Sequence, residues 1–160
     1  ATRQDRKMYD FKSVGETSES LYANRIVRDP TPIGLITPIQ LGRGNHLFKM
    51  HTNLIDQISD NLRNLVLTNH GERVGLYDFG GNLSELAFEL GTEDGDHKAM
   101  MRIKRAVGKY MPFVQLLGFA TETDHFNNKE VAKVVLFITY QVQRINSGKK
   151  GLRITLYSAG

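Results

Sequence analysis

The chain has 160 residues, of which 40% are hydrophobic and 24% are charged, and these values are ordinary for one globular domain. It contains no cysteine, which excludes disulfide bonds, thiolate zinc sites and a cysteine nucleophile. No apolar run reaches the roughly 18–20 residues that a bilayer-spanning helix needs, and the first residues are polar and charged, unlike a secretory signal peptide.

The net charge of +4 is unevenly distributed along the chain. Residues 31–97 carry four basic and nine acidic side chains, whereas residues 98–160 carry eleven basic and three acidic ones. A basic C-terminal part is typical of a protein that binds nucleic acid or an acidic partner surface. It is equally compatible with a solvated basic face.

Residues 1–33 are predicted to form an extended N-terminal arm. Residues 1–30 show no sustained period of 2 or 3.6 and are rich in charged residues, serine and threonine. A segment of this kind has little core of its own, so we expect a partner to order it. The candidate anchors to that partner are Tyr9, Phe11, Leu21 and Tyr22.

A first strand is predicted over residues 34–41, on an edge or at a bulge because Pro38 has no N–H to donate. A helix then begins at Thr52, whose side chain can cap the first turn. Gly71 suits a left-handed cap at its end. The apolar stripe of this helix recurs at spacings of three and four: Leu54, Ile55, Ile58, Leu62, Leu65 and Val66.

Two further helices are predicted. Asn82 can cap a short one that runs through Leu90, and Asp96 can cap a longer one that ends at Tyr110 or Met111, before Pro112. The apolar face of the longer helix contains Ile103, Ala106, Val107 and Tyr110.

The remaining residues predict a meander of three antiparallel strands over 113–123, 131–145 and 152–157. The last strand alternates apolar Leu152, Ile154 and Leu156 with Arg153, Thr155 and Tyr157. Residues 34–160 therefore predict one α+β domain. About three helices pack on a mainly antiparallel sheet formed by the C-terminal strands.

Three ordered motifs occupy the centre of the chain: LVLTNHGERV at 65–74, DFGGNL at 78–83 and LAFE at 86–89. Together they resemble the baseplate wedge and sheath-initiator family of contractile phage tails. This is a lysozyme-like baseplate protein family with a counterpart in type VI secretion baseplates. The family pattern is an amphipathic helix, a Leu-Thr-x-x-Gly-Glu-Arg turn, a Phe-Gly segment and a short helix ending near Phe-Glu. The resemblance covers residues 34–145.

The resemblance implies a virion structural protein without enzymatic activity. It would be assembled in the host cytoplasm into a symmetric tail baseplate that holds several copies. The implied partners are other wedge proteins, tail tube or hub proteins and the tail sheath protein, with no membrane and no nucleic acid. A phage tail and a secretion machine remain alternatives.

The resemblance also implies a contact with neighbouring wedge subunits. Glu72 and Arg73 follow the turn at Gly71, where they can meet a partner or fix the loop to its own domain. The family often carries Glu-Pro-Arg after the long helix, and the matching residues here are Met111, Pro112 and Phe113. The proline is kept and both charges are absent, so this contact would be apolar. Phe79 is expected to fill the core beside Gly80 and Gly81.

The sheath contact implied by the resemblance has a physical basis in the last strand. Its free edge could accept an extended arm of a sheath subunit through Leu152, Arg153, Ile154, Thr155, Leu156 and Tyr157. The apolar residues would set the register, while Arg153, Lys149 and Lys150 would favour an acidic arm. Alternatively, the strand only completes the domain's own sheet. We expect a chain without residues 152–157 to stay folded and to block sheath polymerisation.

Two other classes of function are alternatives for this sequence. A lysozyme-like glycosidase needs two carboxylates across a cleft, one with a raised pKa, and the candidates are Glu72, Glu85, Glu89 and Glu93. The sequence places none of them in an apolar pocket, and it predicts no catalytic, cofactor or metal site. A basic nucleic-acid-binding module is the other alternative, with Arg102, Arg105 and Lys109 as a helical stripe that lacks interleaved aromatics.

Overall fold

The computed structural model describes residues 18, 30–42, 46–86, 89, 92–125, 131–143, 145 and 148–159. The chain divides into two compact units, Ala1–Pro32 and Ile33–Gly160. The predicted anchors of the arm, Tyr9, Phe11, Leu21 and Tyr22, lie outside the described residues. The second unit contains all the helices and strands discussed below.

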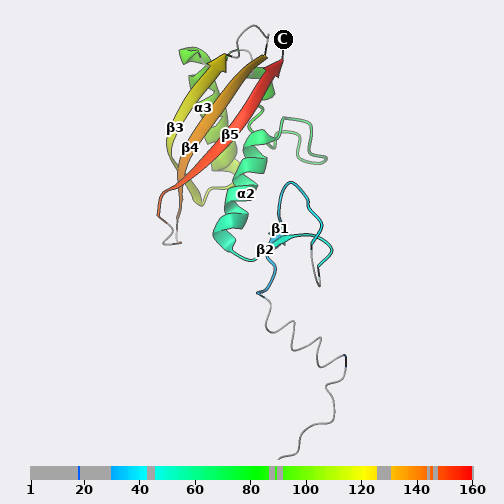
Figure 1. Cartoon of the computed structure of the whole chain (residues 1–160). Coiled ribbons are helices and arrows are strands. Elements are labelled where there is room, and N and C mark those ends of the chain that lie inside the picture. The colour runs from blue at the N-terminus through cyan, green and yellow to red at the C-terminus, as the bar shows by residue number, and fades with distance from the viewer. Residues whose placement is uncertain are drawn as a thin grey trace, which may run out of the picture. The chain divides into compact units, whose positions relative to one another are not determined.

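This unit has the predicted α+β class (Figure 1). Its elements are β1 (Gly34–Leu35), β2 (Met50–His51), α2 (Leu54–Leu67), a 3₁₀ turn η1 (Ser84–Leu86), α3 (Glu93–Tyr110), β3 (Val114–His125), β4 (Val131–Val142) and β5 (Lys150–Ala159). The second unit therefore has two α-helices among its described residues, and the prediction of three is wrong. No helix in the described part of the chain is long and apolar enough to cross a bilayer.

Of the short helix predicted over residues 82–90, the described residues show only η1, at Ser84–Leu86. Asn82 has a φ of 48°, a left-handed conformation instead of the extended one that a helix N-cap adopts. Few residues separate Gly81 from Gly91, and a helix this short is marginal without tertiary support. Local capping chemistry therefore predicted a helix where the described residues form a single 3₁₀ turn.

The helix starts also differ from the predicted ones. Asn53 caps α2, one residue after the predicted Thr52, and accepts a hydrogen bond from the Ile55 N–H at 3.0 Å. Thr92 caps α3 by accepting from the Gly95 N–H at 3.2 Å. The predicted cap of α3, Asp96, instead lies in its acidic first turn, where negative charge favours the helix N-terminus.

The end of α2 is not the left-handed glycine cap that was predicted. The C-cap is Thr68 in an extended conformation, and its N–H donates to the Asn64 carbonyl. Gly71 does have a positive φ of 85°, but it lies in the turn that follows. The glycine therefore reverses the chain three residues after the C-cap, Thr68.

The sheet has the order β3-β4-β5 and is antiparallel, as predicted. β4 and β5 pair without interruption from Val131 with Ala159 to Tyr140 with Lys150. The pairing of β3 with β4 shifts between Leu116 and Gly118, which marks a β-bulge. The two edge strands thus differ, because β5 is regular and β3 is not.

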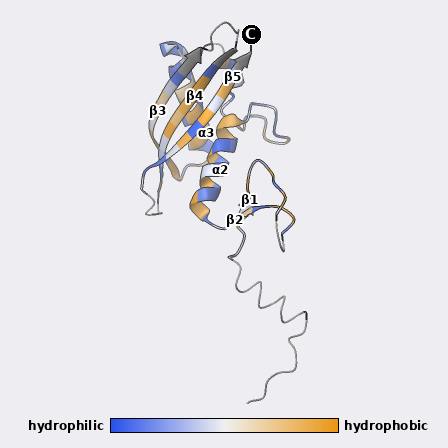
Figure 2. Ribbon diagram, in the orientation of Figure 1, coloured by the Kyte–Doolittle hydropathy of each residue, from blue (hydrophilic) through white to orange (hydrophobic). Residues whose placement is uncertain are grey.

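One face of the sheet carries the hydrophobic core with α2 and α3 (Figures 1 and 2). Residues of the core cluster alternate along β4: Val134, Leu136, Ile138, Tyr140 and Val142. Val135 is also buried but does not belong to this cluster. β5 contributes Leu152 and Ile154, each 3% exposed. Burying a side chain of this size contributes about 1.5–3 kcal/mol. The burial of these side chains argues against the expectation that the domain stays folded without residues 152–157, which stays a prediction.

The strand predicted over residues 34–41 is only two residues long. The Thr37 N–H donates to the Asp60 carboxylate at 2.7 Å and not to a strand, and Pro38 has no N–H. The same carboxylate lies 3.1 Å from Nε2 of His51. Burial raises the pKa of Asp60, but hydrogen bonds from Thr37 and His51 outweigh it and hold the pKa below its usual value. Asp60 thus ties residues 33–51 to α2.

Candidate functional site

The segment from Thr68 to Leu83, called the motif loop here, lies against the end of α2. A Cβ atom on Gly80 would lie 2.1 Å from the carbonyl oxygen of Thr68, and one on Gly81 would lie 2.8 Å from that of Val66. The Gly81 N–H donates to the Leu65 carbonyl at 3.0 Å. The absence of side chains at 80 and 81 therefore allows the close backbone approach that the sequence predicts.

Phe79 packs against the hydrophobic core as expected. Its ring meets that of Tyr110 edge to face, with 4.9 Å between the centroids. The guanidinium carbon of Arg73 lies 4.3 Å from the centroid of the Phe79 ring. The phenylalanine thus links the core to a charged residue of the motif loop.

Glu72 and Arg73 have separate roles in the structure. The Glu72 carboxylate accepts hydrogen bonds from the backbone N–H of Asn69 at 2.8 Å and from its Nδ2 at 2.9 Å. These two bonds hold the pKa of Glu72 below its usual value. The guanidinium of Arg73 makes no hydrogen bond or ion pair with any residue that the structure describes. Glu72 therefore fixes the loop, while the N–H donors of Arg73 remain free for a partner.

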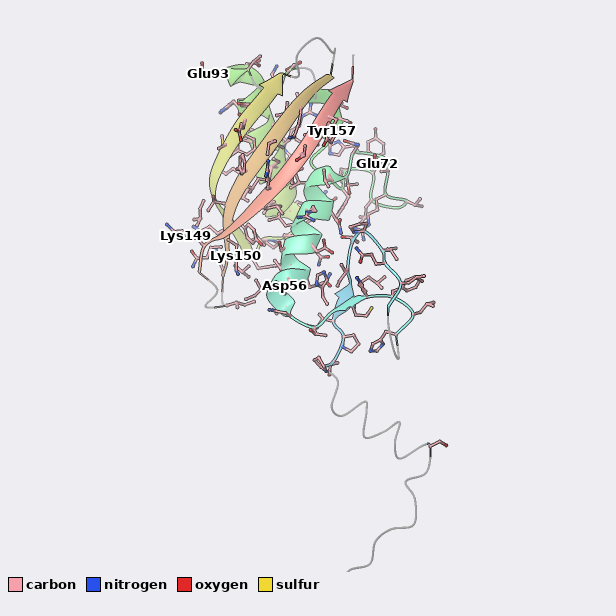
Figure 3. All side chains as sticks on the ribbon, viewed as in Figure 1. Asp56, Glu72, Glu93, Lys149, Lys150 and Tyr157 are labelled. Atoms are coloured by element: carbon pink, nitrogen blue, oxygen red, sulfur yellow. The ribbon has the colours of Figure 1, made fainter. Side chains whose placement is uncertain are left out.

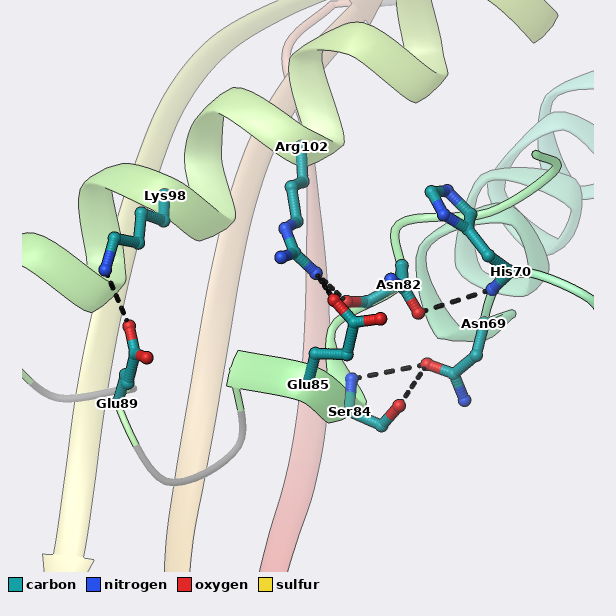
Figure 4. A network of polar contacts seen from close by, with 8 residues as sticks. All are labelled: Asn69, His70, Asn82, Ser84, Glu85, Glu89, Lys98 and Arg102. Carbon is teal, nitrogen blue, oxygen red and sulfur yellow. Dashed lines mark hydrogen bonds and ion pairs between the residues drawn. The ribbon is translucent and has the colours of Figure 1, made fainter.

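Asn69 is a site residue that the sequence reasoning did not single out. Besides donating to Glu72, it accepts hydrogen bonds from the N–H of Ser84 at 3.2 Å and from its hydroxyl at 2.7 Å (Figure 4). The Asn82 side chain accepts from the His70 N–H at 3.3 Å. An asparagine just after a helix, three residues before a glutamate, is the signal that could have indicated this role.

A cavity of about 650 Å³ lies beside the motif loop. Its lining contains four of the five residues predicted for the wedge contact, Glu72, Arg73, Met111 and Phe113, together with Asn61, Asn64, Leu65, Thr68, Phe79 and Tyr110. Met111 is buried and Phe113 is 41% exposed. Pro112 is exposed and does not line the cavity. The structure thus brings together residues about forty positions apart, and their binding of a wedge subunit stays a prediction.

Most of the basic residues of α3 are engaged in ion pairs within the domain. Arg102 donates to the Glu85 carboxylate at 2.9 Å and to the Asn82 carbonyl at 2.6 Å (Figure 4). Lys109 pairs with Asp78. Of the predicted phosphate-binding stripe, only Arg105 has no partner among the described residues. This arrangement disfavours the nucleic-acid alternative, since phosphate affinity needs several unpaired cations on one surface.

Three carboxylates line the cavities on the two sides of the motif loop, Glu72, Asp78 and Glu85. All three have lowered pKa values, and hydrogen bonds from Lys109 and Tyr110 lower that of Asp78 to about 2. A glycosidase needs a carboxylic acid whose pKa is raised. None of the three shows such a raised pKa, and no group of three metal ligands occurs within the described residues. That the chain is not an enzyme stays a prediction.

The other two glutamates considered for glycosidase chemistry lie near the start of α3. Glu89 pairs with Lys98 at 2.9 Å (Figure 4), and Glu93 is exposed in the first helical turn. Their positions are ordinary for surface residues that balance charge at a helix N-terminus.

β5 is an edge strand whose side chains are divided between the two faces of the sheet. Leu152 and Ile154 face the core, so the apolar alternation completes the domain's own sheet and is not available to set a partner's register. Gly151, Arg153 and Tyr157 are exposed. Figure 3 shows Lys149 and Lys150 at one end of β5 and Tyr157 towards the other. Within the described residues, the second edge of β5 is unpaired.

No protein-family model and no curated protein matches the chain. Solved structures are similar to it, including the following two. One belongs to the baseplate of the anti-feeding prophage, solved with six-fold symmetry: it has 19% sequence identity and a TM-score of 0.56, covering 71% of this chain and 87% of the other. The second is a proposed tail lysozyme from Geobacter sulfurreducens, with 20% identity and a TM-score of 0.57, covering 68% of this chain and 95% of the other. The resemblance inferred from the motifs is therefore confirmed at the level of the fold.

Proposed function

We propose that this chain is a structural subunit of a contractile-tail baseplate, which binds neighbouring wedge subunits through the cavity beside the motif loop. The observation that carries the proposal is the convergence of Glu72, Arg73, Met111 and Phe113 on one cavity. The similarity of the fold to a prophage baseplate protein supports the same reading. Several copies in a symmetric baseplate, with tube or hub proteins as further neighbours, complete the proposal.

The cavity has the composition of a protein-binding site. Apolar groups of Phe79, Met111 and Phe113 lie beside the polar side chains of Asn64 and Arg73. Apolar anchors that enter such a hollow carry most of the binding energy in protein interfaces, and polar groups at the rim set orientation. Met111 and Phe113 stand where the family often carries glutamate and arginine, so the contact around them is apolar. Arg73 is the adjacent cation.

We also propose that the free edge of β5 receives an extended arm of the sheath protein. β5 pairs regularly along its whole length, whereas β3, the other edge strand, is interrupted by its bulge. Bulges protect an edge against strand addition, so β5 is the edge better suited to it. Exposed Lys149, Lys150 and Arg153 favour an acidic arm.

The cavity is tested by a pair of matched substitutions. Phe113 and Leu117 are 41% and 42% exposed, and only Phe113 lines the cavity. We expect Phe113→Asp to abolish binding to purified wedge subunits of the same particle and Leu117→Asp to leave it intact. Equal binding by the two variants and the unchanged chain would show that the wedge contact lies elsewhere.

The β5 edge is tested with single-cysteine variants, because the natural chain has no cysteine. Arg153→Cys on β5 and Glu122→Cys on β3 place one thiol on each edge strand, on the face away from the core. After labelling with a short photo-crosslinker and mixing with sheath subunits, we expect a crosslink from position 153 and none from 122. Crosslinks from 122 alone, or from both positions equally, would contradict the assignment to β5.

A further inference from the structure

Residues 72–77, called the knob here, form a small loop whose shape is fixed by backbone hydrogen bonds. At its base, the Gly71 N–H donates to the Tyr77 carbonyl at 2.8 Å. At its tip, the Leu76 N–H donates to the Arg73 carbonyl at 3.1 Å, which closes a β-turn.

Two further features hold this conformation. Gly75 has a φ of 82°, which is the glycine position of a type II turn. The two hydrogen bonds from Asn69 to the Glu72 carboxylate anchor the start of the loop to the end of α2. A loop that is ordered before binding loses little conformational entropy when a partner binds it.

The knob presents apolar side chains to solvent. Val74 at the tip is 100% exposed, Tyr77 is 77% exposed and Leu76 is also exposed. None of these residues contributes to the core of the domain. Tyrosine and arginine are the residue types most enriched among the energetically dominant contacts of protein interfaces. A rigid loop with this composition is typical of a convex element that enters a partner's surface.

Arg73 defines the polar part of this surface. Its guanidinium stacks on Phe79 and has no hydrogen-bond partner among the described residues, whereas the neighbouring Glu72 carboxylate is occupied by Asn69. Arginine N–H groups pair best with a carboxylate in bidentate geometry. Arg73 also lines the cavity beside the motif loop, so the knob and the cavity form one continuous surface.

We propose that the knob inserts Val74 into an apolar hollow of a neighbouring baseplate subunit, while Arg73 pairs with a carboxylate at the rim of that hollow. The inference rests on the proposed function, since the partner is a wedge subunit. It adds Val74, Leu76 and Tyr77 to the contact, and it states the chemistry of the partner's surface.

The test measures the affinity of the unchanged chain and its variants for purified wedge subunits. Val74→Ser should weaken binding by about tenfold, since burying a valine side chain is worth more than the ~1.4 kcal/mol that corresponds to this factor. Met101→Ser is the control, because Met101 is an exposed apolar residue of α3 that lines neither the cavity nor the knob. Its affinity should change by less than about twofold. Both variants should unfold at the temperature of the unchanged chain.

The outcomes separate the knob from the wider proposal. If Val74→Ser binds as well as Met101→Ser while Phe113→Asp loses binding, the knob is refuted and the cavity stands. If the unchanged chain does not bind wedge subunits, both proposals fall.

Where the chain does bind, a photo-crosslinking residue at position 74 locates the hollow on the partner. Arg73→Glu should lose binding. Changing an acidic residue of the partner beside the crosslinked position to arginine should restore it. A crosslinked site without an acidic residue would overturn the pairing.

Discussion

Three glycine-to-alanine substitutions test whether the motif loop is packed as tightly as the structure indicates. At Gly80, a Cβ atom would lie 2.1 Å from the Thr68 carbonyl oxygen, and φ is 122°. At Gly75, φ is 82° but no atom lies within 4 Å of the added carbon. At Gly108, in the exposed side of α3, there is neither a clash nor a positive φ. The three positions thus separate steric overlap from backbone strain.

The expected effects differ in sign and size. Gly108→Ala should stabilise the domain by about 0.5–1 kcal/mol, because alanine loses less backbone entropy in a helix than glycine does. Gly75→Ala should cost about 1 kcal/mol, the strain of a left-handed non-glycine residue. Gly80→Ala combines strain with overlap against backbone that cannot rotate away, so it should cost about 3 kcal/mol or more.

Chemical and thermal unfolding measure these differences. About 1 kcal/mol corresponds to roughly 4 °C in melting temperature for a domain of this size. Gly75→Ala should therefore melt a few degrees lower than the unchanged chain, and Gly80→Ala more than ten degrees lower, about three times as far. If Gly80→Ala cost no more than Gly75→Ala, the contact between residues 80–81 and the end of α2 would be loose. The cavity beside the motif loop would then lack its rigid wall.

Three other predictions follow from buried and charged groups. Asp60→Asn keeps one acceptor for Thr37 and loses the charge, so it should lower the free energy of unfolding by about 1 kcal/mol and raise amide hydrogen exchange in residues 33–51. Unchanged exchange in these residues would refute the role of Asp60 in holding them to α2. The pKa of Asp78 is about 2, below its usual 3.8, because Lys109 and Tyr110 of α3 donate to its carboxylate. The stabilisation from these contacts should persist above pH 3.8 and be lost as the pH falls towards 2, which an NMR titration of the Asp78 carboxyl group checks. Leu152→Ala should cost about 2–5 kcal/mol in urea unfolding, and Arg153→Ala less than about 0.5 kcal/mol.

The main elements of the domain could be predicted from the sequence because their signals are local. The spacing of Ile58, Leu62 and Leu65 gives the buried stripe of α2, and Ile103, Ala106 and Val107 give that of α3. The alternation along residues 152–157 predicts a strand. Turn residues at 124–129 and 146–151, on either side of the middle strand, make the antiparallel meander the natural topology. Periodicity thus identifies which face of each element is buried.

Contacts between residues far apart in the chain could not be predicted from local sequence patterns. β1 stops after two residues because the Thr37 N–H bonds to Asp60, a partner that lies 23 residues away. Glu72 and Arg73 have different roles because Asn69 donates to Glu72 while Phe79 stacks under Arg73. Asn69 precedes the pair in the chain and Phe79 follows it. No local pattern encodes such partners. For the candidate site, the residue types were predictable from a family resemblance, while their division into anchored and free groups was not.

The two faces of β5 show why a strand can serve both the fold and an assembly. Leu152 and Ile154 supply core contacts through their side chains, whereas strand addition would use backbone groups at the free edge, perpendicular to those side chains. Deleting the strand removes both at once, so a failure of sheath assembly after deletion would say nothing about the edge. Substitutions that leave Leu152 and Ile154 in place, such as a labelled cysteine at Arg153, separate the two roles. A sheath that still forms normally when this edge is blocked would assign β5 to the fold alone.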